Sequence, residues 1–208
     1  MKTFHYLYYV IMREMKNNQK IQIALGGEIY EVSNKCLRNY SSWSGKVGQY
    51  LYISHADAGS LVRQYVKKKY KGQDVVVRVS SSSFSGGNSL GVYIHDKLGR
   101  PVDEKIYRDV EEFAHLWEYG KFNGMEDIYD HYESSGAVSD NGNEIQAGVK
   151  YVMVHNRAQF GTMEAILYEV IEEGRQFSEV VKYYTDSSTK KQPARAKEVL
   201  VGMGIEVK

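Results

Sequence analysis

The chain has 208 residues and a formal net charge of +1, so it can bury a real core and carries no global field that favours or excludes nucleic acid. Its single cysteine, Cys36, excludes an internal disulfide and a cysteine-based zinc site, and we expect a cytoplasmic protein without metal or cofactor. The apolar N-terminal run is short and contains His5, so we expect folded protein rather than a signal peptide or membrane anchor.

The first part of the chain predicts strands. Residues 4–12 alternate in polarity, as in a strand with one buried face, although a helix over 4–15 also fits. Residues 20–33 form two short alternating runs around two glycines, which predicts a hairpin. Residues 39–48 are rich in Ser, Gly and Asn and predict a loop.

The middle of the chain predicts three helices and a second hairpin. Ser54, with an acidic residue three positions later, is a typical N-cap for a helix over about 55–70. Alternating runs at 74–95 predict the second hairpin. Amphipathic spacing predicts a helix over about 102–118, and a shorter helix is expected at 124–133.

These elements predict an α+β fold in which helices cover an antiparallel sheet. We expect residues 1–134 to form the main domain and the polar residues 135–148 to be a linker. Residues 149–208 predict a strand followed by three helices, docked on the same core.

The stretch SSSSFSGGNS at residues 80–89 has the composition of a phosphate loop. Such a loop needs a following helix, whereas the next residues alternate like a strand and no Gly-Lys-Ser/Thr occurs. We therefore expect a hairpin tip, in which Gly86 and Gly87 supply positive backbone angles. The polar residues at this tip are candidates for contacts with a partner or with phosphate: Ser83, Ser85, Gly86, Gly87 and Asn88.

Basic residues gather at the end of the helix predicted over 55–70 and in the next strand. Packing of the helix on the hairpin would place them together, and a few phosphate contacts would then make binding depend on salt. Lysine at a helix C-terminus also has a structural explanation, since it complements the helix dipole. The candidate residues are Lys67, Lys68, Lys69, Lys71 and Arg78.

Catalytic candidates are fewer. His95, Asp127 and His131 could meet as an acid–base or metal cluster, although the chain has no helical zinc motif. Carboxylates on a short surface helix are more often a solvated face. Two hypotheses therefore remain: a chain without catalytic residues, and a chain that uses this cluster for catalysis.

Two stretches together resemble a large-polyvalent-protein-associated domain. One is the Ser-rich hairpin with its SGGxS turn, and the other is the later YGxFxGMxDxY signature. The matching residues are Ser81, Ser85, Gly86, Gly87, Ser89, Tyr119, Gly120, Phe122, Gly124, Met125, Asp127 and Tyr129. The resemblance covers about residues 50–134 and implies an α+β fold and a phage, plasmid or conjugative-element context, with no catalytic residues to transfer.

We therefore expect a small counter-defence protein of anti-CRISPR or anti-restriction type. Its partner would be a host defence nuclease or ribonucleoprotein, or the RNA or DNA that such a complex holds. Two alternatives are a small metal- or histidine-dependent nuclease and a non-catalytic structural accessory protein.

Overall fold

The computed structural model describes residues 20–25, 27–41, 47–123, 128–131, 138–139, 144–184 and 188–207. Within them the fold is α+β, which confirms the predicted fold class. The strand expected at 4–12 lies outside the described residues. No helix in the described part of the chain has the length and apolar character needed to cross a bilayer.

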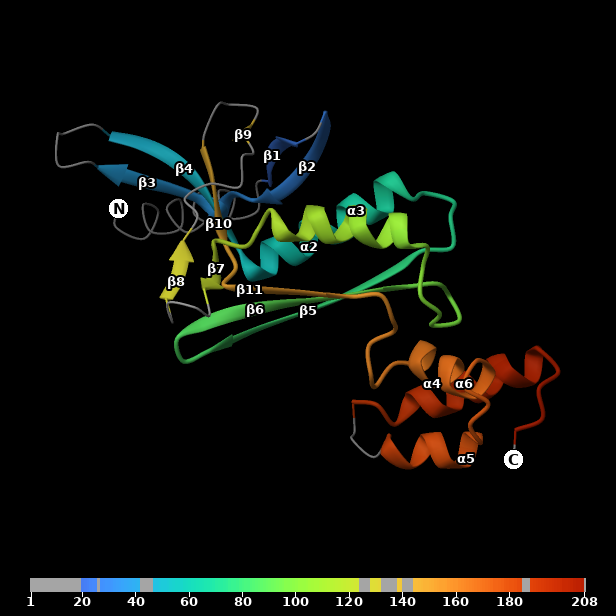
Figure 1. Ribbon diagram of the computed structural model, residues 1–208. Coiled ribbons are helices and arrows are strands. Elements are labelled where there is room, and N and C mark those ends of the chain that lie inside the picture. Colours follow the sequence, from blue (N-terminus) through green and yellow to red (C-terminus); the bar gives the residue numbers. More distant parts are fainter. Residues whose placement is uncertain are drawn as a thin grey trace, which may run out of the picture. The chain divides into compact units, whose positions relative to one another are not determined.

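Contacts divide the chain into two compact units, each made of separate segments (Figure 1). Unit 1 contains Met1–Tyr65, Ser80–Leu90 and Glu112–Met153. Unit 2 contains Val66–Val79, Gly91–Glu111 and Val154–Lys208. Several strands and helices therefore begin in one unit and end in the other.

A six-stranded sheet with the order β2-β1-β9-β10-β4-β3 lies in unit 1. Its strands are β1 (Lys20–Leu25), β2 (Glu28–Ser33), β3 (Leu37–Ser41), β4 (Val47–Ser54), β9 (Val138–Ser139) and β10 (Glu144–Gly148). The hairpin predicted at residues 20–33 is confirmed, since β1 pairs antiparallel with β2. The sheet is mixed rather than wholly antiparallel, because β10 runs parallel to β4.

Three predictions for unit 1 need correction. Much of the loop expected at 39–48 belongs to β3 and β4, which pair with each other. Part of the expected linker is β10. The helix expected at 124–133 is wrong, because Ile128–His131 is strand β8 and pairs with β7 (Gly120–Asn123). So short a segment fits either period, and pairing with a neighbouring strand decides it.

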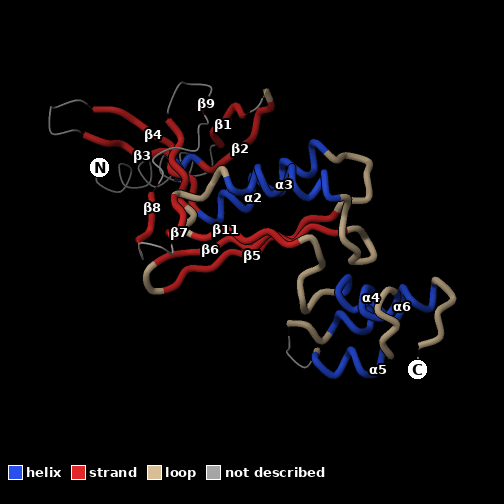
Figure 2. The backbone as a smooth tube through the Cα atoms, in the orientation of Figure 1, coloured by secondary structure: helices blue, strands red, loops and turns tan. Residues whose placement is uncertain are grey.

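The second predicted hairpin is confirmed as β5 (Val76–Phe84) and β6 (Gly87–His95), two long strands in Figure 2. β6 is the central strand of a three-stranded sheet and is flanked by β5 and β11 (Tyr151–His155). On one face of β6 the side chains of Leu90, Val92 and Ile94 are fully buried. Their spacing of two residues makes this the core face of the strand.

Helix α2 (His55–Lys69) begins where the sequence predicts. The Ser54 hydroxyl oxygen accepts the Asp57 backbone N–H at 3.3 Å, and the hydroxyl donates to Asp57 Oδ2 at 2.5 Å. The predicted N-cap is therefore confirmed. Asp57 also influences the nearby Cys36. Burial and the Asp57 charge raise the pKa of the Cys36 thiol to about 12.

An aromatic cluster forms part of the core of unit 1. Phe113, in helix α3 (Glu104–His115), stacks on Tyr65 with 3.9 Å between ring centroids. Tyr30 and Trp117 lie against the same ring at 5.5 and 5.9 Å. Buried rings contribute large apolar areas, so this cluster adds to the stability of unit 1.

The end of the chain in unit 2 is helical. It contains α4 (Met163–Ile171), α5 (Phe177–Val180), a 3-10 turn at Val181–Tyr183 and α6 (Lys191–Gly202). Thr162 caps α4, since its hydroxyl oxygen accepts the Ala165 backbone N–H. A small core joins these helices, with buried side chains from Ile166, Leu167, Val180, Tyr184, Ala196 and Leu200.

Candidate functional site

The turn between β5 and β6 consists of Ser85 and Gly86. A turn of two residues joins antiparallel strands, so SSSSFSGGNS is a hairpin tip, as expected, and not a phosphate loop before a helix. Gly86 has φ +92°, a conformation that favours glycine. Gly87 is not among the residues with positive φ, which corrects that part of the expectation.

Three serines of β5, Ser81 to Ser83, are exposed, and two of them make hydroxyl contacts. Ser82 Oγ lies 2.8 Å from Ser89 Oγ across the hairpin. Ser83 Oγ lies 3.3 Å from Nε2 of His55, the first residue of α2. Ser83 and Ser85, two of the predicted partner-binding residues, both lie on the surface.

An exposed apolar patch lies next to this tip. Phe84 of β5 stacks on Tyr151 of β11 with 6.1 Å between ring centroids, and the two residues are 48% and 37% exposed. Met153, two positions along β11 and so on the same face as Tyr151, is 47% exposed, whereas Val152 between them is buried. We call Phe84, Tyr151 and Met153 the hairpin patch.

Asn88 and Lys150 hold β11 beside the hairpin tip. The Asn88 side chain donates to Gly148 O at 2.9 Å and accepts the Lys150 backbone N–H at 2.8 Å. The Lys150 ammonium donates to Gly86 O at 2.8 Å and lies 5.4 Å from the Tyr151 ring centroid. Asn88 and Gly86, predicted to contact a partner, therefore help to position the hairpin patch.

Gly87 contributes through its lack of a side chain. A Cβ at this position would lie 2.6 Å from Cδ of Lys150 and 3.4 Å from the Phe84 ring. Glycine thus lets the Lys150 stem pack against the start of β6 beside the hairpin patch.

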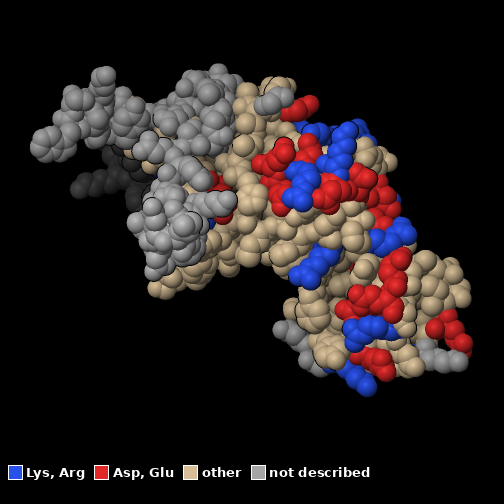
Figure 3. Space-filling model, in the orientation of Figure 1, with Lys and Arg blue, Asp and Glu red and all other residues tan. Residues whose placement is uncertain are grey.

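One of the lysines at the end of α2 is paired with an acidic residue. The Lys69 ammonium donates to Asp109 of α3, and the same carboxylate accepts the Tyr70 hydroxyl. In Figure 3, Lys and Arg side chains are interspersed with Asp and Glu over α3, where Arg108 makes two further ion pairs. The remaining predicted lysines are exposed: Lys67, Lys68 and Lys71.

Arg78 takes part in a partly buried ion pair. Its guanidinium donates to Glu164 Oε1 of α4 at 2.6 Å. Burial alone would raise the pKa of the Glu164 carboxyl, but the Arg78 hydrogen bond and charge outweigh it and hold the pKa below its usual value. Arg78 therefore neutralises Glu164, which leaves less of its charge for an external phosphate.

Of the candidate catalytic residues, only His95 has a side chain in the part of the chain that the structure describes. His95 is fully buried, and its Nδ1 lies 2.6 Å from the backbone oxygen of Asp96. A general acid or base must reach its substrate, and a buried ring does not. Asp127 lies outside the described residues, and of His131 only the backbone in β8 lies within them. No metal-ligand group of three His, Cys, Asp or Glu occurs in the described ranges.

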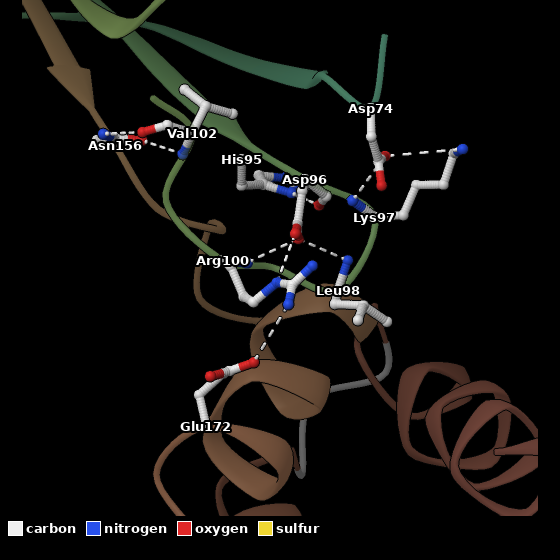
Figure 4. A network of polar contacts seen from close by, with 9 residues as sticks. All are labelled: Asp74, His95, Asp96, Lys97, Leu98, Arg100, Val102, Asn156 and Glu172. Atoms are coloured by element: carbon white, nitrogen blue, oxygen red, sulfur yellow. Dashed lines mark hydrogen bonds and ion pairs between the residues drawn. The ribbon is translucent and has the colours of Figure 1, made fainter. Parts of the chain in front are cut away.

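A polar network closes the turn after β6 (Figure 4). The Asp96 carboxylate accepts the backbone N–H groups of Leu98 and Arg100 at 2.8 and 2.9 Å and the Arg100 Nε–H at 2.6 Å. These bonds outweigh the effect of burial and lower the pKa of Asp96. Arg100 also lies 3.7 Å from Glu172, directly after α4. These bonds tie the turn to the Asp96 carboxylate.

Tyr151 and Met153 are not among the site residues predicted from the sequence. Their alternation with Val152 was visible in the sequence, but the alternation does not say which face of a strand stays open. Phe84 is the one large apolar side chain of SSSSFSGGNS, and it was not predicted as a site residue either.

The fold and this surface define an α+β protein with an exposed apolar patch on a small sheet. No known protein family, curated protein or solved structure matches the chain at a significant level. The resemblance to a large-polyvalent-protein-associated domain therefore stays a prediction.

Proposed function

We propose that this chain is a counter-defence protein of a phage or other mobile element, which binds a protein of a host nuclease complex and blocks it without catalysis. The observation that carries the proposal is the hairpin patch, three large apolar side chains exposed on one face of a sheet. Aromatic and methionine side chains are enriched at the centres of protein interfaces. Clustered exposed apolar side chains mark interaction sites more often than single ones do.

The surroundings of the hairpin patch favour a protein partner over nucleic acid. Binding to phosphate needs several available cations. The neighbouring Lys150 is already hydrogen-bonded to Gly86, and the exposed side chains of Ser81 to Ser83 are uncharged. An uncharged apolar centre with a polar rim is the usual arrangement of a protein interface.

The mobile-element context rests on the sequence resemblance. Ser85, Gly86 and Gly87, which carry its first motif, form the hairpin tip directly after Phe84. An anti-CRISPR or anti-restriction role is the concrete form of the proposal, because such a protein acts by occupying a host complex and needs no catalytic residues of its own.

The proposal is tested by phage plating on bacteria that express the chain together with an active CRISPR or restriction nuclease. We expect the chain to restore plating of a targeted phage. Purified chain should inhibit cleavage stoichiometrically, with full inhibition near one chain per nuclease complex. Cleavage of the DNA or RNA by the chain itself, or no protection against any nuclease tested, would contradict the proposed function.

The double variant Phe84→Ala/Tyr151→Ala tests the surface. Loss of two interface anchors should cost about 2 kcal/mol or more, which is roughly a 30-fold loss of affinity, and protection should fall accordingly. Ile29→Ala, at another exposed apolar residue of unit 1, is the matched control and should keep full protection. A folded double variant that still protects would remove the hairpin patch from the proposal.

A further inference from the structure

A cavity of about 440 Å³ lies in unit 2. Its walls come from β6, the turn after β6, the loop 157–160 after β11, and the residues on and after α4. Outside that loop, the lining residues are Tyr93, Gly99, Ala165, Tyr168, Glu169, Glu173 and Arg175. This volume is within the range of small-molecule sites, about 300–1,000 Å³. The cavity is therefore large enough for a small organic ligand.

Two of the walls are held in place by hydrogen bonds. The Asp96–Arg100 network fixes the turn that contains Gly99 (Figure 4). Asn156, just before the loop 157–160, accepts the Val102 backbone N–H at 2.8 Å and donates to Val102 O at 3.0 Å. Walls that are ordered before binding reduce the entropy cost of taking up a ligand.

Arg157 is the cation of this cavity without a partner among the described residues. The other lining guanidinium, Arg175, is bonded to Glu169. His155 stacks on Tyr93 at 4.8 Å, and burial and the Arg157 charge lower the pKa of its ring, which disfavours a positive charge there. An anionic group on a ligand would therefore pair with Arg157, and phosphate suits the guanidinium geometry.

The other lining groups suit a flat heterocycle with an amino group. Tyr93, Phe160 and Tyr168 offer aromatic rings, and Phe160 is 66% exposed at the cavity. Base-on-aromatic stacking is a common source of affinity for nucleotides. Glu169 and Glu173 offer carboxylates that accept N–H groups. Burial and, to a smaller extent, the Glu173 charge raise the pKa of Glu169, whereas the Arg175 charge lowers it. An added N–H donor would stabilise this carboxylate.

We propose that this cavity binds a nucleoside monophosphate whose base carries an amino group, with the base against the aromatic rings and the phosphate on Arg157. The site consists of residues of unit 2 alone. It does not depend on the counter-defence role, which rests on the hairpin patch.

Titration calorimetry on the full chain tests the phosphate contact, with AMP, adenosine and inorganic phosphate as separate probes. AMP should bind about tenfold more tightly than adenosine, because one charged hydrogen-bonding pair is added. Arg157→Gln should remove this difference. Arg195→Gln, an exposed arginine of α6 that does not line the cavity, should keep it.

The pair CMP and UMP tests the amino group, since the two bases are alike in shape but carry an amine and a carbonyl at the same position. CMP should bind more tightly, and Glu169→Gln should reduce the ratio of the two affinities, because the carboxamide can donate to the UMP carbonyl. Absence of binding by AMP and CMP at millimolar concentration would overturn the proposal. Equal affinity of AMP and adenosine for the unmodified chain would overturn it as well.

Discussion

Gly99 lies where the turn after β6 meets α4, and a residue with a side chain does not fit there. Its φ is +85°, and a Cβ would lie 2.1 Å from the backbone oxygen of Glu164. Gly72 has nearly the same φ, +84°, but nothing lies within 4 Å of its Cβ position. Substitutions at the two positions therefore distinguish the free-energy cost of the backbone conformation, which both share, from that of the clash, which occurs only at Gly99.

We predict that Gly99→Ala destabilises the protein far more than Gly72→Ala does. The left-handed conformation costs an alanine about 1–2 kcal/mol at either site. The clash with backbone at Gly99 should bring the loss there to about 3 kcal/mol or more. Urea unfolding measures both. Equal losses would mean that the turn can move away from α4 at little cost.

The ion pair of Arg78 and Glu164 should make stability depend on acid pH. Since the folded-state pKa of Glu164 is below its ordinary value of 4.5, the ionised carboxylate stabilises the fold above that value. This contribution is lost as the pH falls below 4.5 through the folded-state pKa. Glu164→Gln should therefore flatten the acid side of the stability curve, whereas the exposed Glu179→Gln should leave its slope unchanged. Urea unfolding across a pH series checks this.

At the scale of elements, α2 depends on a local signal that the sequence contains in full. Ser54→Ala removes the hydroxyl that accepts the Asp57 N–H and should cost about 1 kcal/mol. Ser81→Ala, at an exposed serine of β5, should change stability by less than about 0.5 kcal/mol. Thermal and urea unfolding of the two variants compare them. A loss at Ser81 as large as at Ser54 would show that serine removal itself, and not the cap, is being measured.

Other elements were predictable because their signals also lie in residues close together in the chain. The hairpin at 20–33 and the hairpin tip at Ser85–Gly86 follow from alternation interrupted by glycine, which acts over a few residues. The error at 124–133 has the opposite cause. Ile128–His131 is short enough for either period, and its pairing with Gly120–Asn123 made it a strand.

At the scale of the whole molecule, the organisation follows contacts between distant segments. β10 lies in the stretch expected to be a linker and pairs in parallel with β4, far from it in the chain. Unit 2 joins Val66–Val79 and Gly91–Glu111 to the C-terminal residues. Composition and turn patterns do not predict such pairings, because these patterns describe residues close in sequence, whereas the pairings join residues that are close only in space.

The sequence by itself determined the α+β class, the cap at Ser54 and the hairpin turn at Gly86. Each of these follows from backbone preferences and hydrogen bonds between residues close in the chain. Only the tertiary structure decided that His95 is buried and Arg78 is paired, while Phe84 and Tyr151 are exposed. Burial depends on which segments pack on each face of a strand, so the hairpin patch became visible only in the folded chain.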